Sequence, residues 1–388
     1  MMLWRALLIL GSTMTSSAFD PLPSKTVFRI SQGLDLVLLS DDEVLVQFGT
    51  RSHPSELFRD SDMTGVLART IGRLLQGPAT LDDLIAAAGE SHANDVAEFV
   101  NHLFDRGFLS SAEQDPVEQY LRYSFDGATA LGEQSVALFG CGPLGARIAE
   151  GLVQHGVGSI VLVDDRKTDV LWEKSAPLNW TTGEELKSAA AAVAEALSSN
   201  GSKVERVSGQ TNAVMVDDVI TKTGFAIMAM EQVDLRLGHL INRFAIRRRK
   251  PWLHVAIDGN FAVVGPLFEP PYTACYNDFR TLATAATPSA DMMNRYRRHI
   301  LERPASSFFP GLPAYAEIAA GYAVLAAVHR LLGRPSFASG RAMMINFEQF
   351  QIDVEEVLRL PRCPVCGSQK TIPRPVSPPD FASGHQSK

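Results

Sequence analysis

Two cysteines near the C-terminal end have the spacing of a metal-binding turn. They occur in Cys363-Pro-Val-Cys366-Gly367, where the glycine opens the turn after the second cysteine. A structural zinc site needs four ligands, and one Cys-x-x-Cys pair supplies two of them. An upstream segment, Cys275-Tyr-Asn-Asp278, repeats this spacing with an aspartate in place of the second cysteine. We therefore expect a zinc site formed by Cys275, Cys363 and Cys366, with Asp278, Asn277 or water as the fourth ligand.

The spacing of these cysteines allows two other interpretations. A redox-active Cys-x-x-Cys pair lies at the start of a helix early in a fold, whereas this pair precedes a tail rich in Pro and Ser, so metal binding is favoured. A site that has lost its metal stays open as an alternative. The remaining cysteine, Cys141, has no histidine placed near it by the local sequence, and we interpret it as a small buried residue.

A glycine-rich turn follows a buried strand in the middle of the chain. Residues 135–139 form an apolar run, and the turn Gly140-Cys-Gly142-Pro-Leu-Gly145 leads into an amphipathic helix that extends to about His155. A second apolar run, 160–163, ends at Asp164. Strand, glycine turn, helix, strand and acid in this order form a mononucleotide-binding unit. Its glycines let the backbone approach a phosphate at the helix N-terminus, and its acid can accept from a ribose hydroxyl.

This unit predicts an α/β fold with a Rossmann-like parallel sheet. Further strands are expected at 203–207, 225–228 and 252–255, and helices at 184–197, 235–248 and 318–332. The helix at 318–332 is too short and too charged to span a membrane, so we interpret it as a buried helix. The basic run 247–250 ends a helix, where cations suit the helix dipole, and we interpret it as solvated.

The N-terminal part has the pattern of a winged-helix domain. Apolar, β-branched runs at 34–39 and 44–48 flank a polar turn and predict a hairpin. Helical spacing over 67–75, a helix opened by Thr80 and Asp83, and helical spacing over 96–103 predict three helices, followed by a short strand at 107–109.

The charge of this part argues against DNA. Residues 25–115 contain seven Lys or Arg and fifteen Asp or Glu, a net charge of −8. The third helix, where a DNA reader places its base contacts, is itself acidic, and phosphate contacts supply most of the affinity for DNA. A DNA-binding regulator fused to a nucleotide sensor is therefore disfavoured. Binding of an extended peptide at the sheet edge, or a structural cap, stay as alternatives.

Composition and boundaries agree with a protein of more than one domain. The chain has 388 residues, 46% of them hydrophobic, and a net charge of −7, which disfavours nucleic acid and anionic membranes as partners. We expect a flexible N-terminus at 1–24, a winged-helix domain at 25–112 (a peptide-recognition domain by the resemblance described below), a linker at 113–134, a Rossmann domain with the zinc knuckle at 135–372, and a disordered tail at 373–388. For the first segment, a mis-assigned start with Met14 as the natural one, or a frayed terminus, is favoured over a signal peptide, so the expected location is cytoplasmic.

Several of these motifs together resemble the ubiquitin-activating-enzyme (ThiF/MoeB) superfamily. The glycine turn with the segment Gly156-Val-Gly-Ser-Ile-Val-Leu-Val-Asp164 is similar to that superfamily. The segments 251–255 and 265–275, the helix at 319–332 and the knuckle 361–367 resemble the ThiF-like leader-peptide-binding proteins of thiazole- and oxazole-modified peptide (TOMM, bacteriocin) biosynthesis. The resemblance implies that the chain binds the leader of a ribosomally made precursor peptide, delivers it to a YcaO-type cyclodehydratase and forms a homodimer.

Departures from the superfamily separate this role from an adenylating enzyme. Adenylating members carry Asn-Leu-x-Arg-Gln after the ribose acid, and its Arg neutralises ATP phosphate charge; here residues 169–178 contain no Arg. The resemblance places the family lysine near Lys187 and the magnesium aspartate near Val233, beside Asp234. We expect a degenerate nucleotide site of Gly140, Gly142, Gly145, Asp164 and Lys187, no catalytic residue, and leave ATP binding open. A ThiF/MoeB-type enzyme that adenylates a peptide or ubiquitin-like C-terminus is the alternative.

Leader binding is expected at the N-terminal sheet. An extended leader would add as a strand to an exposed edge and gain backbone hydrogen bonds, while pockets near the third helix would select its side chains. Phe99, Leu103 and Phe104 are the candidate pocket walls, with membership of the ordinary core as the alternative for each.

Overall fold

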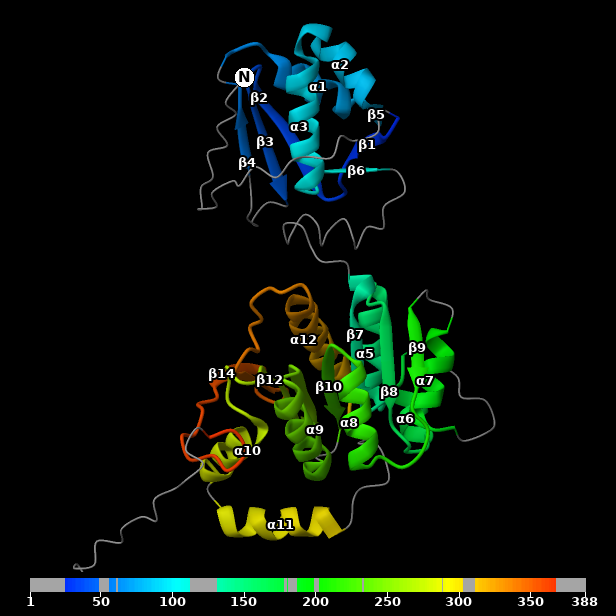
Figure 1. Cartoon of the computed structure of the whole chain (residues 1–388), viewed down its shortest axis with the longest axis vertical. Helices are drawn as coiled ribbons and strands as arrows, with labels where there is room; N and C mark the ends of the chain where they lie inside the picture. The colour runs from blue at the N-terminus through cyan, green and yellow to red at the C-terminus, as the bar shows by residue number, and fades with distance from the viewer. Residues whose placement is uncertain are drawn as a thin grey trace, which may run out of the picture. The chain divides into compact units, whose positions relative to one another are not determined.

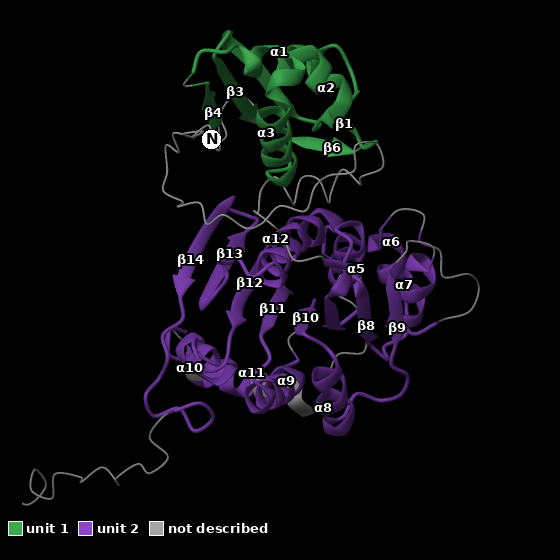
Figure 2. Cartoon of the chain, turned by 45° about the horizontal axis from the view of Figure 1, so that its top comes forward, with its two compact units in different colours: residues 1–129 green, residues 130–388 purple. Residues whose placement is uncertain are grey.

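The computed structural model describes residues 25–48, 56–60, 62–111, 131–177, 180, 187–198, 202–231, 234–287, 289–302 and 311–367. The chain divides into two compact units, residues 1–129 and residues 130–388 (Figure 2). The expected flexible N-terminus and disordered tail lie outside the described residues, as does most of the expected linker.

The described residues of the N-terminal unit form two small sheets and three α-helices around one apolar core. One sheet has the order β2-β3-β4 and the other β5-β1-β6. The strands are β1 (Val27–Ile30), β2 (Leu34–Ser40), β3 (Glu43–Phe48), β4 (Glu56–Arg59), β5 (Ala79–Thr80) and β6 (Leu109–Ser111). The helices are α1 (Val66–Leu75), α2 (Leu81–Ala88) and α3 (Ala93–Asp105).

The local signals of this unit are largely confirmed. The predicted hairpin is β2 paired with β3. Thr80 and Asp83 form a capping box at the start of α2, in which each side chain accepts from the other residue's backbone N–H. The strand predicted at 107–109 begins two residues later, because the backbone of Gly107 and Phe108 closes the end of α3 through hydrogen bonds to Phe104 and Leu103.

The C-terminal unit is built on one eight-stranded sheet (Figure 1). Its order is β14-β13-β12-β11-β10-β7-β8-β9. The five strands from β11 to β9 run parallel, and β12, β13 and β14 extend the sheet antiparallel. The strands are β7 (Ser135–Phe139), β8 (Ser159–Val163), β9 (Lys203–Arg206), β10 (Phe225–Met230), β11 (Trp252–Asp258), β12 (Phe261–Phe268), β13 (Arg341–Asn346) and β14 (Gln351–Glu356). The α/β fold with a Rossmann-like parallel sheet is thus confirmed.

Helices cover both faces of this sheet (Figure 2). They are α5 (Pro143–Gln154), α6 (Val170–Ser175), α7 (Ala189–Leu197), α8 (Ala213–Lys222), α9 (Leu235–Arg248), α10 (Tyr276–Ala285), α11 (Ala290–Glu302) and α12 (Pro313–Leu331). On one face α5 packs against both α7 and α12, and on the other α8 packs against α9. Among the described residues, none of the helices combines the length and the apolar content that a membrane span requires.

Two helix predictions are corrected. The helix expected from residue 184 begins at Ala189, because the Ser188 side chain accepts from the backbone N–H of Ala191 and caps it there. The helix expected to be buried at 318–332 is α12, which begins earlier and is buried on one side. Ile318 and Leu325 on its other side are 43% and 45% exposed.

The contact between α5 and α12 gives a stability prediction with a matched control. A Cβ atom at Gly151 of α5 would lie 2.8 Å from a methyl of Val324, whereas one at Gly321 on the exposed side of α12 would meet nothing within 4 Å. We expect Gly151→Ala to lower the free energy of unfolding by about 1–3 kcal/mol through overpacking. We expect Gly321→Ala to raise it by about 0.5–1 kcal/mol through helix propensity.

Urea unfolding followed by tryptophan fluorescence measures both changes in the C-terminal unit, which contains Trp172, Trp180 and Trp252. Equal effects of the two substitutions would contradict the described packing of α5 on α12.

Candidate functional site

The glycine turn lies between β7 and α5 at the carboxyl end of the parallel strands. Gly140 has φ 101, and a Cβ atom there would lie 1.9 Å from the carbonyl oxygen of Ala229 in β10. A Cβ atom at Gly145 would lie 1.9 Å from the carbonyl oxygen of Gly140. Both positions therefore need glycine so that β7, α5 and β10 can approach one another. We call residues 140–145 the glycine loop.

The candidate ribose acid, Asp164, is already bonded within the chain. It follows β8 and is 6% exposed. One carboxylate oxygen accepts from the backbone N–H of Cys141 at 2.7 Å. The Arg166 guanidinium donates to both oxygens at 3.0 and 2.7 Å. Burial alone would lower the pKa of Arg166, but the charge and hydrogen bonds of Asp164 raise it well above its ordinary value. The sequence interpretation missed Arg166, although it stands two residues after Asp164.

A second carboxylate meets the glycine loop from the end of β10. Glu231 Oε1 accepts from the backbone N–H of Leu144 at 2.8 Å, and the residue is 4% exposed. Its Oε2 is buried without a hydrogen-bond partner, 4.0 Å from Nη2 of Arg166. Burial raises the pKa of Glu231, although Arg166 and the Leu144 amide act in the opposite direction. The sequence interpretation did not single out this residue.

The other residues expected near a nucleotide have different partners. Lys187 Nζ pairs with Glu195 of α7 at 2.5 Å. Asp234 caps α9 by accepting from the backbone N–H of Leu237, and Val233 lies outside the described residues. The structure therefore brings Asp164 and the three glycines together, while the described side-chain bonds of Lys187 and Asp234 go to neighbouring helices.

The segment that replaces the arginine motif has a structural role. Asp169 caps α6 by accepting from the backbone N–H of Trp172, whose ring nitrogen donates to the carbonyl oxygen of Cys141 at 2.8 Å. The interpretation of Cys141 as a small buried residue is confirmed: its side chain is fully buried, and burial raises the pKa of its thiol well above the ordinary value.

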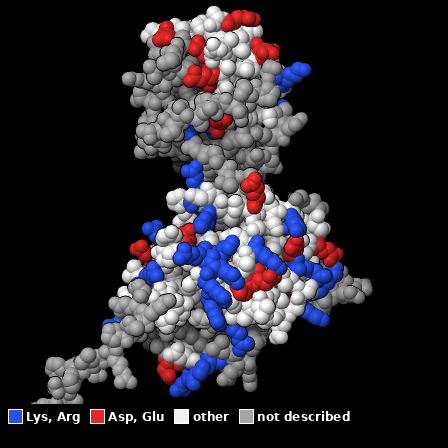
Figure 3. Space-filling view, in the orientation of Figure 1, with Lys and Arg blue, Asp and Glu red and all other residues white. Residues whose placement is uncertain are grey.

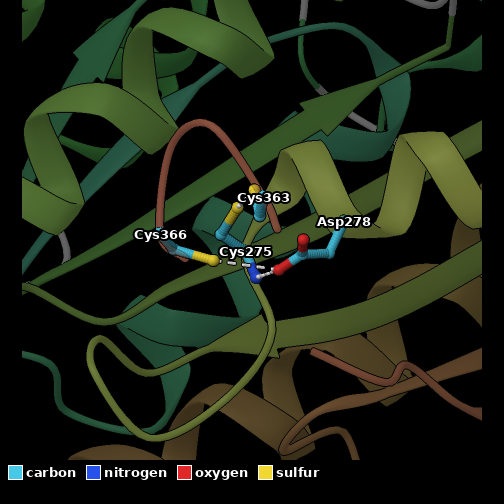
Figure 4. Close-up of side chains that lie close together, drawn as sticks. All are labelled: Cys275, Asp278, Cys363 and Cys366. Carbon is cyan, nitrogen blue, oxygen red and sulfur yellow. Dashed lines mark hydrogen bonds between the residues drawn. The ribbon is translucent and has the colours of Figure 1, made fainter. Parts of the chain in front are cut away.

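A compact cluster joins the start of α10 to the C-terminal knuckle (Figure 4). It consists of Cys275, Asp278, Cys363 and Cys366, whose ligand atoms all lie within 4.8 Å of one another. We call these four residues the cysteine cluster. The sequence prediction that they meet is confirmed, and they could hold a metal ion. Asn277, an alternative fourth ligand, donates its side-chain amide to the sulfur of Cys363 at 3.4 Å.

One sulfur–sulfur distance in the cysteine cluster agrees with a tetrahedral ion. The sulfurs of Cys275 and Cys363 are 3.7 Å apart. A tetrahedron with metal–sulfur distances of about 2.3 Å separates its sulfurs by about 3.8 Å. Asp278 is fully buried, and its Oδ1 has no hydrogen-bond partner in the described structure. Burial raises the pKa of Cys275 to about 11, so this thiol would need a nearby cation to become a thiolate.

The candidate peptide-binding side chains lie on α3 of the N-terminal unit. Phe99 and Leu103 belong to the core, 3% and 0% exposed, and Phe99 meets Phe58 of β4 edge-on with ring centroids 5.5 Å apart. Phe104 is half-buried against Phe28, at 5.8 Å between centroids. In this conformation Phe104 is thus the one of the three that reaches the surface.

The edge strand β4 is tied to α3 by charge. Glu56 at the start of β4 forms an ion pair with Arg106, directly after α3, and its carboxylate lies 3.8 Å from His102. Burial would raise the pKa of Glu56, but His102 and Arg106 together lower it. The described residues 25–111 contain six Lys or Arg against thirteen Asp or Glu, and Figure 3 shows acidic side chains over the visible face of this unit.

Comparisons with known proteins follow this geometry. The ThiF family matches residues 118–366. The microcin C7 biosynthetic enzyme MccB in complex with N-formylated MccA has a TM-score of 0.60 at 15% identity, covering 88% of this chain and 100% of that chain. E. coli MccB with ATP has a TM-score of 0.57 at 15% identity with the same coverage. PaaA has a TM-score of 0.52 at 18% identity, covering 68% of this chain and 92% of that chain.

At these identities the solved structures establish a shared fold. The comparison with curated proteins finds no match. The family match spans well over half of the chain and includes the glycine loop and the cysteine cluster, so the superfamily resemblance stated from the sequence is confirmed. The chain belongs to the ThiF family.

Proposed function

We propose that this chain binds the leader of a ribosomally made precursor peptide and delivers it to a YcaO-type cyclodehydratase that forms thiazoline and oxazoline rings. One observation carries the proposal. The likeness to MccB covers 88% of the chain and so extends beyond the C-terminal unit, and one of those MccB structures holds the peptide MccA. Both halves of this protein thus share the fold of a peptide-binding relative.

In this proposal residues 25–112 are a winged-helix recognition domain and the leader adds as a strand to β4. This strand is an edge of its sheet, and α3 packs beside it through Phe58 and Phe99. A strand added at β4 would gain backbone hydrogen bonds and place alternate side chains toward α3. Phe104 and the exposed residues at the end of α3 would then contact the leader.

A charge reversal at each edge of this sheet tests the placement. Asp105 is exposed at the end of α3, beside β4, whereas Asp35 is exposed on β2, the opposite edge. We expect Asp105→Lys to weaken binding of a fluorescent leader peptide about tenfold or more, as measured by anisotropy. Asp35→Lys should leave the Kd within about twofold and serves as the matched control. A larger loss of leader affinity in Asp35→Lys than in Asp105→Lys would place the leader at the β2 edge instead.

The adenylating alternative makes the opposite kinetic prediction. An adenylating enzyme releases pyrophosphate when it activates a carboxylate, so it exchanges labelled pyrophosphate into ATP. This chain has no Arg in residues 169–178, and its Asp164 is engaged by Arg166. We expect no exchange above background with or without the precursor, since losing such charge stabilisation costs orders of magnitude in rate. Exchange that depends on the precursor peptide would identify a working adenylating enzyme.

The ion proposed for the cysteine cluster is zinc. Cys275, Cys363, Cys366 and Asp278 would hold it, with Asn277 donating to a ligating sulfur. Three sulfurs and one oxygen suit the ligand preference of zinc, and a bound ion would give the partnerless oxygen of Asp278 a ligand role. The ion would have a structural role, because the four side chains leave no open coordination position for substrate.

Metal analysis tests this assignment. We expect about one zinc per chain in the purified protein, and loss of that zinc in Cys363→Ser. The same substitution should lower the free energy of unfolding by about 3 kcal/mol or more, as for loss of a ligand present at a hundredfold excess over its Kd. Cys141→Ala, which removes a buried thiol outside the cluster, should keep the zinc. Protein that is free of metal and equally stable would contradict the site.

The proposal includes the homodimer that the family resemblance implies and the cytoplasmic location that the sequence leads us to expect. Light scattering coupled to size exclusion measures the mass directly, and a mass equal to that of one 42.2 kDa chain would remove the dimer from the proposal.

A further inference from the structure

The position in front of α5 that a phosphate would take is filled by a side chain of the protein. Glu231 reaches back from the end of β10, and its Oε1 accepts from the backbone N–H of Leu144 in the first turn of α5. A Cβ atom at Gly142 would lie 2.3 Å from both carboxylate oxygens, so the carboxylate lies directly against the glycine loop. Gly142 thus makes room for Glu231.

Two of the backbone donors that would receive a phosphate are already in use. A helix N-terminus after a glycine turn binds phosphate through its first free backbone N–H groups. In this loop Pro143 has no N–H, the N–H of Cys141 donates to Asp164, and that of Leu144 donates to Glu231. A carboxylate has the same charge sign and the same acceptor chemistry as a phosphate oxygen, so it satisfies both the N–H group and the helix dipole.

The charges around the loop also oppose a further anion. Asp164 and Glu231 are both nine-tenths buried or more, and Arg166 is the cation that the described structure pairs with them. Arg166 already donates to both oxygens of Asp164, which leaves Oε2 of Glu231 without a hydrogen bond. A di- or triphosphate placed here would meet one shared guanidinium and two carboxylates.

We propose that Glu231 is the specificity-determining residue of the glycine loop: its carboxylate takes the place of a nucleotide phosphate and excludes nucleoside di- and triphosphates. The inference concerns the ligand of this loop and holds whether or not the N-terminal unit binds a leader peptide. It also gives a physical reason why a chain with an intact nucleotide-binding fold would perform no adenylation.

Removal of this carboxylate should open the loop. The probes are MgADP and MgATP, titrated calorimetrically into the full chain. We expect the wild type to bind them weakly or not measurably, and Glu231→Ala to bind at least tenfold more tightly, about 1.4 kcal/mol. Glu317→Ala is the matched control. Like Glu231, Glu317 lies beside an arginine, in its case Arg147 of α5, but it lies outside the glycine loop. It should bind nucleotide as the wild type does.

A second variant keeps the proposal testable if Glu231→Ala does not fold. Glu231→Gln keeps an acceptor for the Leu144 amide and removes the charge. It should also bind MgADP and MgATP more tightly than the wild type does. Equal nucleotide affinity in the wild type and in both folded variants, whether tight or absent, would overturn the proposal. Leader affinity measured on the same proteins separates this proposal from the proposed function. A wild type that binds no leader peptide would count against the proposed function alone.

Discussion

The backbone of the glycine loop approaches its neighbours so closely that side chains are excluded, and the C-terminal unit depends on this approach. Gly140 lies against β10 and Gly145 lies against Gly140, so β7, α5 and β10 meet at one point. The position of α5 follows from that contact, and α12 packs on α5 at Gly151. A methyl group at Gly140 or Gly145 would push apart the elements that carry Asp164, Glu231 and the loop itself.

Most of the parallel half of the sheet was predictable because four of its five strands, β7, β8, β10 and β11, are largely buried apolar runs. Residues 135–139 and the strands at 203, 225 and 252 begin where the patterns indicated. The antiparallel extension of β12, β13 and β14 was not predicted. All six residues of β14 are exposed, and its Ile352 and Val354 alternate with acids without a buried face that would select them. Burial produces the pattern from which most strands are recognised, so the fully exposed strand β14 gave little signal.

The candidate sites were predictable to different degrees for a related reason. The cysteine cluster has rare residue types at fixed spacing, and a repeated spacing identified its members across 88 residues. Asp164 was found from its place after a strand, but its partner Arg166 depends on how the chain turns back after that strand. Glu231 ends a fully buried strand, and an acid in that position was a usable signal. Phe99 and Phe104 show the limit, because the same helix supplies side chains to both the core and the surface.

The cysteine cluster has a topological consequence. Its members join the start of α10 to a turn 88 residues later, and between them lie α11, α12 and the last two strands. A metal ion held at that point would close a long loop, and long loops lose much chain entropy in the unfolded state when their ends are held together. Without such a link, β13 and β14 depend on their strand pairing and α12 on its packing against α5, while the parallel strands keep their own hydrogen bonds. A metal ion bound here would therefore stabilise the antiparallel edge of the sheet more than its parallel half.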